Sequence, residues 1–287
     1  MKWPALLERA RPEPDSTIAY GEDQLQKVDL WLPPGAGPHP TVLMVHGGCW
    51  QTEIADRRIM NWIADDLRKR GIAVWNIDYR GVDRTGGGYP GTFADAAAAA
   101  DSLRTHAAHF KLDLSPLVAV GHSAGGHLAL WLAARRAVNR RPASPLIPSG
   151  SPILAADPLR IDTVVSLGGL PDLELAATPP GSGCGTEVIE KLVGPPTLSS
   201  RSVYADTSVP RLAPLGVRQV LINGLQDRII PTAYAGDYSA KMRASGDKVK
   251  VRMIDRTGHV ELIAPETAAW AATVEEIEAA LGRSGRR

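Results

Sequence analysis

The chain is poor in cysteine and has no excess of charge of either sign. Only Cys49 and Cys184 occur among its 287 residues, and neither lies in a Cys-x-x-Cys pair or in a Cys/His cluster with zinc spacing. The sequence therefore predicts neither a disulfide framework nor a metal site. Lys and Arg number 32 against 31 Asp and Glu, which leaves a net charge of +1. Without a strong overall field, neither nucleic acid nor a membrane surface is an expected partner.

Long apolar runs are also missing. The segment from Met1 to Ala10 has no apolar run of signal-peptide length, and no apolar segment of about 18 residues occurs elsewhere. We therefore expect a cytoplasmic protein. The basic C-terminal residues 283–287 are expected to form a solvated tail without a function.

Short apolar segments typical of buried strands alternate with segments of helical periodicity. Because 44% of the residues are hydrophobic, the chain can bury one large core. The alternation predicts a mostly parallel sheet with helices on both faces, after an antiparallel strand pair within 17–32. The predicted strands are 42–45, 72–77, 117–120, 161–167, 217–222 and 249–254, and the predicted helices are 59–70, 92–110, 123–137, 232–245 and 273–281.

A glycine-rich turn joins the strand at 117–120 to the helix that follows it. Gly121-His122-Ser123-Ala124-Gly125 matches the G-x-S-x-G pattern of a nucleophile elbow. A sharp turn that pushes Ser123 outward leaves no room for a Cβ atom at position 121 or 125. The start of the helix adds free N–H groups and a dipole that favours developing negative charge. The sequence predicts that Ser123 is a nucleophile, with a purely structural turn as the alternative.

A nucleophilic serine needs a general base, and the base needs an acid that orients it. Among the seven histidines, His259 follows the last predicted strand and is the predicted base. Asp227 follows the strand at 217–222 and lies between the serine and the histidine in the chain, which is the expected order for this acid. Asp255 and Asp206 are the alternatives.

The tetrahedral intermediate of acyl transfer also needs N–H donors for its oxyanion. The loop His46-Gly47-Gly48-Cys49-Trp50 follows the first parallel strand, and few of its side chains shield the backbone. We predict that the amides of Gly48, Cys49 and Ala124 form the oxyanion hole. Trp50 is predicted to line the substrate site or to anchor the loop, with an ordinary core position as the alternative.

The longest stretch without periodicity, residues 168–214, is rich in Pro, Gly and Ser. Insertions of this length are often lids or binding loops. We expect this insertion, together with 81–91, to cover or line the pocket of a single domain that spans residues 1–287. A plain surface excursion is the alternative.

These motifs resemble those of a known superfamily. The segment 46–50 resembles the H-G-G-x-W motif of kynurenine (aryl) formamidases and the H-G-G-G motif of hormone-sensitive-lipase-like esterases. Asp78-Tyr79-Arg80 is similar to the D-Y-R that these enzymes often carry after the second parallel strand. The resemblance implies an α/β-hydrolase fold with about eight strands and a short cap-like insertion. It also implies a serine hydrolase with Ser123, Asp227 and His259 as its triad.

The resemblance spans about residues 24–280 but does not decide the substrate. The first functional prediction is a carboxylic ester hydrolase that acts on small or aryl substrates through an acyl-enzyme. Arylformamidase activity is the alternative, because a formyl amide passes through the same kind of intermediate. A serine peptidase is less expected, since the chain has no additional substrate domain, and a non-catalytic binding protein is a further alternative. No cofactor is expected, and the oligomeric state, including a homodimer, is open.

Overall fold

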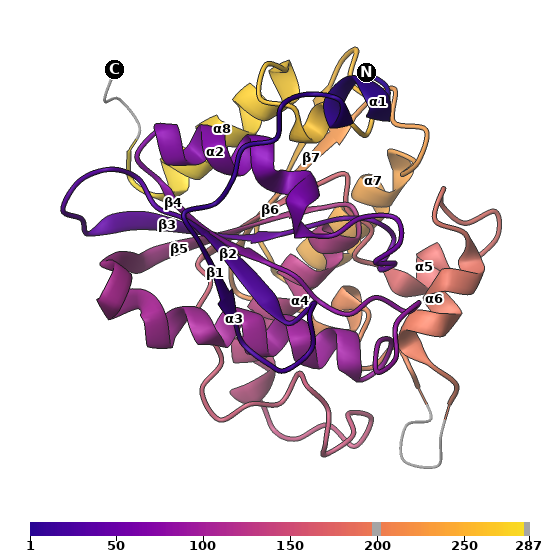
Figure 1. The fold of residues 1–287 in the computed structure, drawn as a ribbon. Helices are drawn as coiled ribbons and strands as arrows, with labels where there is room; N and C mark the ends of the chain where they lie inside the picture. The colour runs from indigo at the N-terminus through magenta and orange to yellow at the C-terminus, as the bar shows by residue number, and fades with distance from the viewer. Residues whose placement is uncertain (197–201, 284–287) are drawn as a thin grey trace.

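The computed structural model describes residues 1–196 and 202–283, so residues 284–287 of the basic tail lie outside the described chain (Figure 1). Eight strands form one sheet in the order β1-β2-β4-β3-β5-β6-β7-β8. They are β1 Ser16–Ala19, β2 Lys27–Trp31, β3 His39–Val45, β4 Ala73–Ile77, β5 Leu112–His122, β6 Thr163–Leu167, β7 Arg218–Gly224 and β8 Val249–Ile254. Only the pairs β1–β2 and β2–β4 are antiparallel among these strands. The predicted mostly parallel sheet is confirmed.

Alternating side chains along the strands separate two apolar cores. In β3, Leu43 and Val45 face one core, whereas Val42 and Met44 face the other. Helices cover both faces of the sheet, with α2 and α8 on one side and α3 and α4 on the other (Figure 1). The main helices are α2 Asn61–Lys69, α3 Gly91–Phe110, α4 Ala124–Asn139, α7 Ala233–Ala244 and α8 Ala268–Ala280.

Several short elements go beyond the sequence prediction. They are α1 Trp3–Leu7, α5 Leu173–Ala176 and α6 Thr186–Val193, together with the 3-10 turns η1 Arg57–Met60, η2 Val209–Leu212 and η3 Glu261–Ile263. Helices of four or five residues leave too few apolar repeats for a periodicity to be recognised. In α6 the apolar residues Val188, Ile189, Leu192 and Val193 do lie on one face, and sequence reasoning missed this short pattern. The last helix begins at Ala268 rather than at Thr273, because the side chain of Thr267 caps it by accepting a hydrogen bond from the Trp270 amide. Among the described helices, none is long and apolar enough to cross a membrane.

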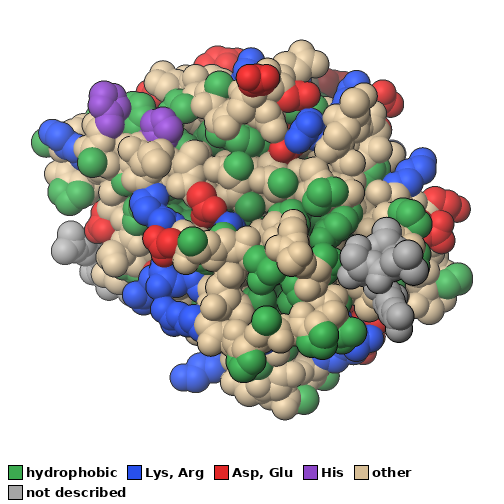
Figure 2. All heavy atoms as spheres, turned by 90° about the horizontal axis from the view of Figure 1, so that it is seen from below, with side chains coloured by type: hydrophobic (Ala, Val, Ile, Leu, Met, Phe, Trp, Pro, Cys, Tyr) green, Lys and Arg blue, Asp and Glu red, His purple; other side chains and the backbone are tan. Residues whose placement is uncertain are grey.

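The charged side chains are mixed on the face of the molecule shown in Figure 2. Several basic side chains gather in one group with acidic side chains beside them, other charged side chains of both signs are scattered, and much of the remaining face is neutral. This arrangement fits the net charge of +1.

The loops that carry the predicted site residues meet at one edge of the sheet. The strands β3, β5, β7 and β8 each end there, and the parallel register places Val45 of β3 opposite Gly121 of β5. The carboxyl edge of a parallel sheet is where ligands bind in open α/β folds. The topology therefore gathers the loops after residues 45, 122, 224 and 254 into one region.

Candidate active site

Ser123 occupies the sharp turn between β5 and α4. Its backbone has φ 54° and ψ −121°, a conformation that L-residues rarely adopt. A Cβ atom on Gly121 would lie 2.1 Å from the carbonyl oxygen of Gly125, and one on Gly125 would lie 2.2 Å from that of Val45. Both glycines are thus required by close backbone approach, as the elbow pattern predicts.

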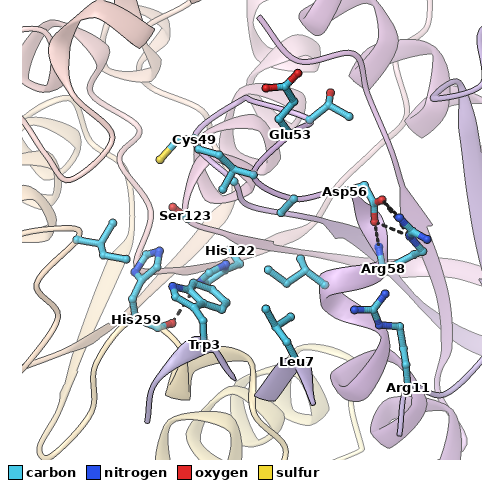
Figure 3. A pocket seen from close by; sticks show the side chains of 16 residues that line it. Trp3, Leu7, Arg11, Cys49, Glu53, Asp56, Arg58, His122, Ser123 and His259 are labelled. Atoms are coloured by element: carbon cyan, nitrogen blue, oxygen red, sulfur yellow. Dashed lines mark hydrogen bonds and ion pairs between the residues drawn. The ribbon is translucent and has the colours of Figure 1, made fainter. Parts of the chain in front are cut away.

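His259 and Asp227 are in direct contact. The Nδ1 atom of His259 lies 2.7 Å from Oδ2 of Asp227, and both side chains are buried. The other carboxylate oxygen of Asp227 accepts hydrogen bonds from the amides of Ile229 at 2.8 Å and Ile230 at 2.9 Å. These two amides hold the carboxylate in one orientation, so that Oδ2 faces the imidazole. His259 also lines a pocket with Ser123 (Figure 3). Since His259 contacts Asp227, the structure brings all three predicted residues together.

The two alternative acids lie elsewhere. Asp255 is exposed, and its carboxylate accepts a hydrogen bond from Gln226 at 3.3 Å. Asp206 is buried and accepts hydrogen bonds from the hydroxyl groups of Tyr89, at 2.7 Å, and Ser151. Neither carboxylate is bonded to His259, so Asp227 is the acid that the geometry supports.

The predicted oxyanion loop lies against Ser123. A Cβ atom on Gly47 would come within 3.0 Å of the Ser123 Cβ atom. The next two residues, Gly48 with φ 107° and Cys49 with φ 52°, turn the backbone into the left-handed region. Over the part of the chain that the structure describes, the amides of Gly48, Cys49 and Ala124 donate no hydrogen bond. These N–H groups are free to bind an oxyanion.

A buried polar network holds this loop from behind. The His46 Nε2 atom lies 2.9 Å from Oδ1 of Asp78, and the Tyr79 hydroxyl donates to the His46 carbonyl oxygen at 2.9 Å. The Tyr79 ring stacks on the imidazole at 4.3 Å. Burial raises the pKa of Tyr79 well above its usual value, so that the hydroxyl keeps its proton and remains a donor. Asp78 and Tyr79, which sequence reasoning noted only as a family motif, are therefore supports of the oxyanion loop.

Trp50 does not line the pocket, which was the first of its two predicted roles. It is fully buried, and it packs edge-on against His127 with ring centroids 5.5 Å apart. A direct contact with substrate is therefore not found. Trp50 instead anchors the loop in the core, which was the second predicted role.

The two cysteines also differ from the prediction. Cys49 and Cys184 form a disulfide with their Cα atoms 5.4 Å apart, although 135 residues separate them in the sequence. The spacing of the two cysteines in the sequence does not predict this bond, because the packing of the insertion 168–214 against the loop 46–50 brings them together. Sequence reasoning excluded only a disulfide framework and did not anticipate this single bond.

The pocket in front of Ser123 has a volume of about 410 Å³. Among the described residues, none from 81–91 or 168–214 lines it, although both segments were expected to. The N-terminal helix α1 forms part of the wall, and Trp3 lies edge-on to the rings of His122 and His259, at 6.4 Å from each (Figure 3). Sequence reasoning missed Trp3 because five helical residues show no periodicity. The other apolar lining side chains are Leu7, Ile54, Ala55, Ile59 and Ile229.

Two further histidines of the elbow region are buried without an acidic partner. Burial lowers the pKa of His127 to about 4, and its Nε2 atom donates to the Thr207 carbonyl oxygen at 2.8 Å. Burial, with a smaller contribution from the nearby His259, also lowers the pKa of His122 well below its usual value. Both imidazoles are therefore uncharged at neutral pH.

Because these buried histidines are uncharged, we expect the folded protein to lose stability in mild acid. In the unfolded chain His127 takes up a proton near pH 6.5, the ordinary pKa of histidine. In the folded protein, where burial lowers its pKa, it takes up that proton only near pH 4. We expect the free energy of unfolding to fall over that interval, by on the order of 3 kcal/mol for His127 alone, with no further contribution from this residue at lower pH. Urea unfolding at about pH 7 and about pH 4.5 measures the effect. His127→Gln should lose less stability over this interval than the wild type, and an equal loss in the two proteins would contradict the assignment.

The sequence of this chain matches the profile of a known protein family. The BD-FAE family profile matches residues 28–242, which is most of the chain and includes Ser123 and Asp227. The chain belongs to the BD-FAE family. The predicted base of this BD-FAE protein, His259, lies beyond the matched residues. A comparison with curated proteins finds no match.

Solved structures share the fold of this BD-FAE protein at low sequence identity. Esterase B from Lactobacillus Rhamnosis is 17% identical with a TM-score of 0.76, and the match covers 97% of this chain and 90% of that one. A truncated carbohydrate esterase from gut microbiota is 18% identical with a TM-score of 0.69, covering 95% and 99%. Native esterase 2 from Thermogutta terrifontis is 19% identical with a TM-score of 0.71, covering 98% of each chain. These similarities confirm the α/β-hydrolase fold.

Proposed function

We propose that this BD-FAE protein is a serine hydrolase that cleaves carboxylic esters of small or aryl substrates through an acyl-enzyme. The observation that carries the proposal is the 2.7 Å contact between His259 and Asp227 beside the pocket that Ser123 lines. A nucleophile, a buried acid and a base, which follow three strand ends in this chain order, form the arrangement needed for acyl transfer.

In the first half of the reaction, Oγ of Ser123 attacks the ester carbonyl carbon while Nε2 of His259 accepts the hydroxyl proton. Asp227 stabilises the resulting imidazolium through Nδ1, which it already contacts at 2.7 Å. The proton then passes to the leaving alkoxide, which departs as the alcohol and leaves an acyl-serine. Water repeats the same sequence, with His259 again as the base, and releases the acid.

The negative charge on the carbonyl oxygen needs donors in both halves of the reaction. In this proposal the free amides of Gly48, Cys49 and Ala124 supply them. Such preorganised donors are worth roughly 10²–10³ in rate each. The dipole of α4, a helix of 16 residues that begins at Ala124, favours the same charge.

The pocket supports a small or aromatic substrate. Its volume of about 410 Å³ lies in the range of small-molecule sites, and its walls include Trp3, Leu7, Ile54 and Ile59. The structurally similar proteins are named as esterases, and Thermogutta terrifontis esterase 2 has propionate-bound and butyrate-bound structures. The formamidase alternative has no comparable support among them.

The disulfide indicates in which kind of cellular compartment the protein is located. A half-buried disulfide persists in oxidising compartments and is rare in the cytosol, where thiols are kept reduced. The Cys49–Cys184 bond therefore favours an oxidising compartment over the cytoplasmic location that the missing apolar runs led us to expect.

A fluorophosphonate probe and two substrates test the proposed function. We expect the probe to label Ser123 stoichiometrically, and kcat/KM for p-nitrophenyl acetate to exceed that for N-formylkynurenine by at least about tenfold, because only the pocket distinguishes the two reactions. Far faster turnover of the formamide would instead make the protein an arylformamidase. Tight binding of an ester or amide without any turnover would identify a binding protein on a hydrolase fold.

A further inference from the structure

The backbone of the oxyanion loop adopts a conformation that its residues do not favour. Gly48, Cys49 and Trp50 have consecutive φ values of 107°, 52° and 54°, and two of the three carry a Cβ atom. Residues with side chains stay in the left-handed region only where the surrounding structure holds them there. The position of the Cys49 amide therefore depends on what anchors this loop.

The neighbours of Cys49 are anchored by hydrogen bonds and packing. The Trp50 side chain is fully buried, and its carbonyl oxygen accepts a hydrogen bond from the Val82 amide at 2.7 Å. The Gly48 carbonyl oxygen accepts from the Gln51 amide at 2.8 Å. Cys49 itself is anchored by its disulfide with Cys184.

Cys184 is held firmly enough to act as an anchor. Only Gly185 separates it from α6, which buries Val188, Ile189 and Leu192 in the larger apolar core. On its other side, the amide of Gly183 donates to the Ile229 carbonyl oxygen at 2.7 Å. The disulfide therefore ties the loop to a helix that is packed into the core.

The segment around Cys184 also connects the predicted oxyanion loop with the loop that carries Asp227. Ile229 lines the pocket, and its amide donates to Oδ1 of Asp227 at 2.8 Å. A chain of contacts thus runs from Asp227 through Ile229 and Gly183 to the disulfide and the Cys49 amide. Cys184 does not line the pocket and can act on the reaction only through this chain.

We propose that Cys184 is a positioning residue: its disulfide holds the Cys49 amide in the oxyanion hole, so that reduction of the bond lowers turnover. The proposal rests on the proposed esterase function. A small dithiol such as dithiothreitol would break the S–S bond, leaving both cysteines as thiols, while the dithiol loses two electrons and two protons and closes to a cyclic disulfide. Both cysteines are half-buried, so a small reductant can reach them.

The test measures kcat and KM per active site, with the number of sites counted by fluorophosphonate titration. We expect Cys184→Ser and the reduced wild type each to lose about tenfold in kcat with little change in KM, since the oxyanion donor is displaced rather than removed. Dithiothreitol should not slow the variant further, and reoxidation should restore only the wild type. The double variant Cys49→Ser/Cys184→Ser should lose no more than the single variant, because both remove the same bond.

Three results would overturn the proposal while leaving the esterase function intact. The first is that Cys184→Ser and the reduced wild type have the same kcat per titrated site as the oxidised wild type. The second is that these two proteins lose only titratable sites or melting temperature. The third is that both cysteines are free thiols in wild-type protein prepared without reductant. If Cys184→Ser does not fold, the kcat per titrated site of the folded wild type, measured with and without dithiothreitol, tests the proposal instead. A wild type that neither hydrolyses esters nor binds the probe would remove the proposed function, and this proposal with it.

Discussion

Replacing Ser123 with Ala is expected to lower kcat for ester hydrolysis by about 10⁵-fold and to abolish fluorophosphonate labelling. No other hydroxyl stands at the elbow, and the residual rate would come from the oxyanion donors and from binding alone. KM should change little, because the apolar walls remain. Steady-state kinetics on p-nitrophenyl acetate, with mass spectrometry of the labelled protein, measures both effects.

A matched control for this variant is Ser166→Ala. Ser166 is a buried serine in the neighbouring strand β6, and within the described residues its hydroxyl has no hydrogen-bond partner. Its loss should leave kcat within a few-fold of the wild type. Substantial turnover by Ser123→Ala would show that another group is the nucleophile, and the proposed mechanism would be wrong.

The second large effect is expected from Asp227→Asn, with kcat falling by about 10³–10⁴-fold. The amide oxygen of asparagine can still accept from Ile229 and Ile230, so the loop should keep its shape. An NH₂ group would then face Nδ1 of His259, which stabilises the tautomer that cannot accept a proton from Ser123. Steady-state kcat, with the circular dichroism spectrum as a check of folding, measures this loss.

Asp255→Asn is the control for the acid, because Asp255 lies four residues before the histidine in the sequence but is exposed and bonded to Gln226. Its replacement should leave kcat within a few-fold of the wild type. A large loss with Asp255→Asn and a small one with Asp227→Asn would exchange the roles of the two carboxylates.

The predictions that agree with the structure rest on local patterns. Gly121 is required by its close contact with Gly125 inside the turn, and Gly125 by its close contact with Val45 at the end of β3. The pattern of both glycines is nevertheless visible in a pentapeptide. Asp227 and His259 were found because each follows a predicted strand, and parallel strands end at a common edge. Chain order and strand ends were therefore enough to bring Ser123, Asp227 and His259 together without knowledge of the packing.

The predictions that fail concern contacts between distant segments. Trp50 could have faced the pocket or the core, and only the packing of α4 behind the loop, with His127 at 5.5 Å, decides for the core. The insertion 168–214 was expected over the pocket, whereas α1 forms part of the pocket wall and the insertion reaches the loop through Cys184. A five-residue helix and an irregular segment have no periodic signal that indicates where they pack.

By itself, the sequence determined the class of fold, the elbow and the three residues of the predicted triad, because these depend on spacing along the chain and on the ends of strands. The tertiary structure alone decided which residues line the pocket in front of Ser123 and how the predicted oxyanion loop is held. Those features depend on contacts such as Trp3 with His259 and Cys49 with Cys184, which join segments 256 and 135 residues apart. Such contacts arise only when the whole core packs, because the free energy that forms them comes from buried surface shared among many elements.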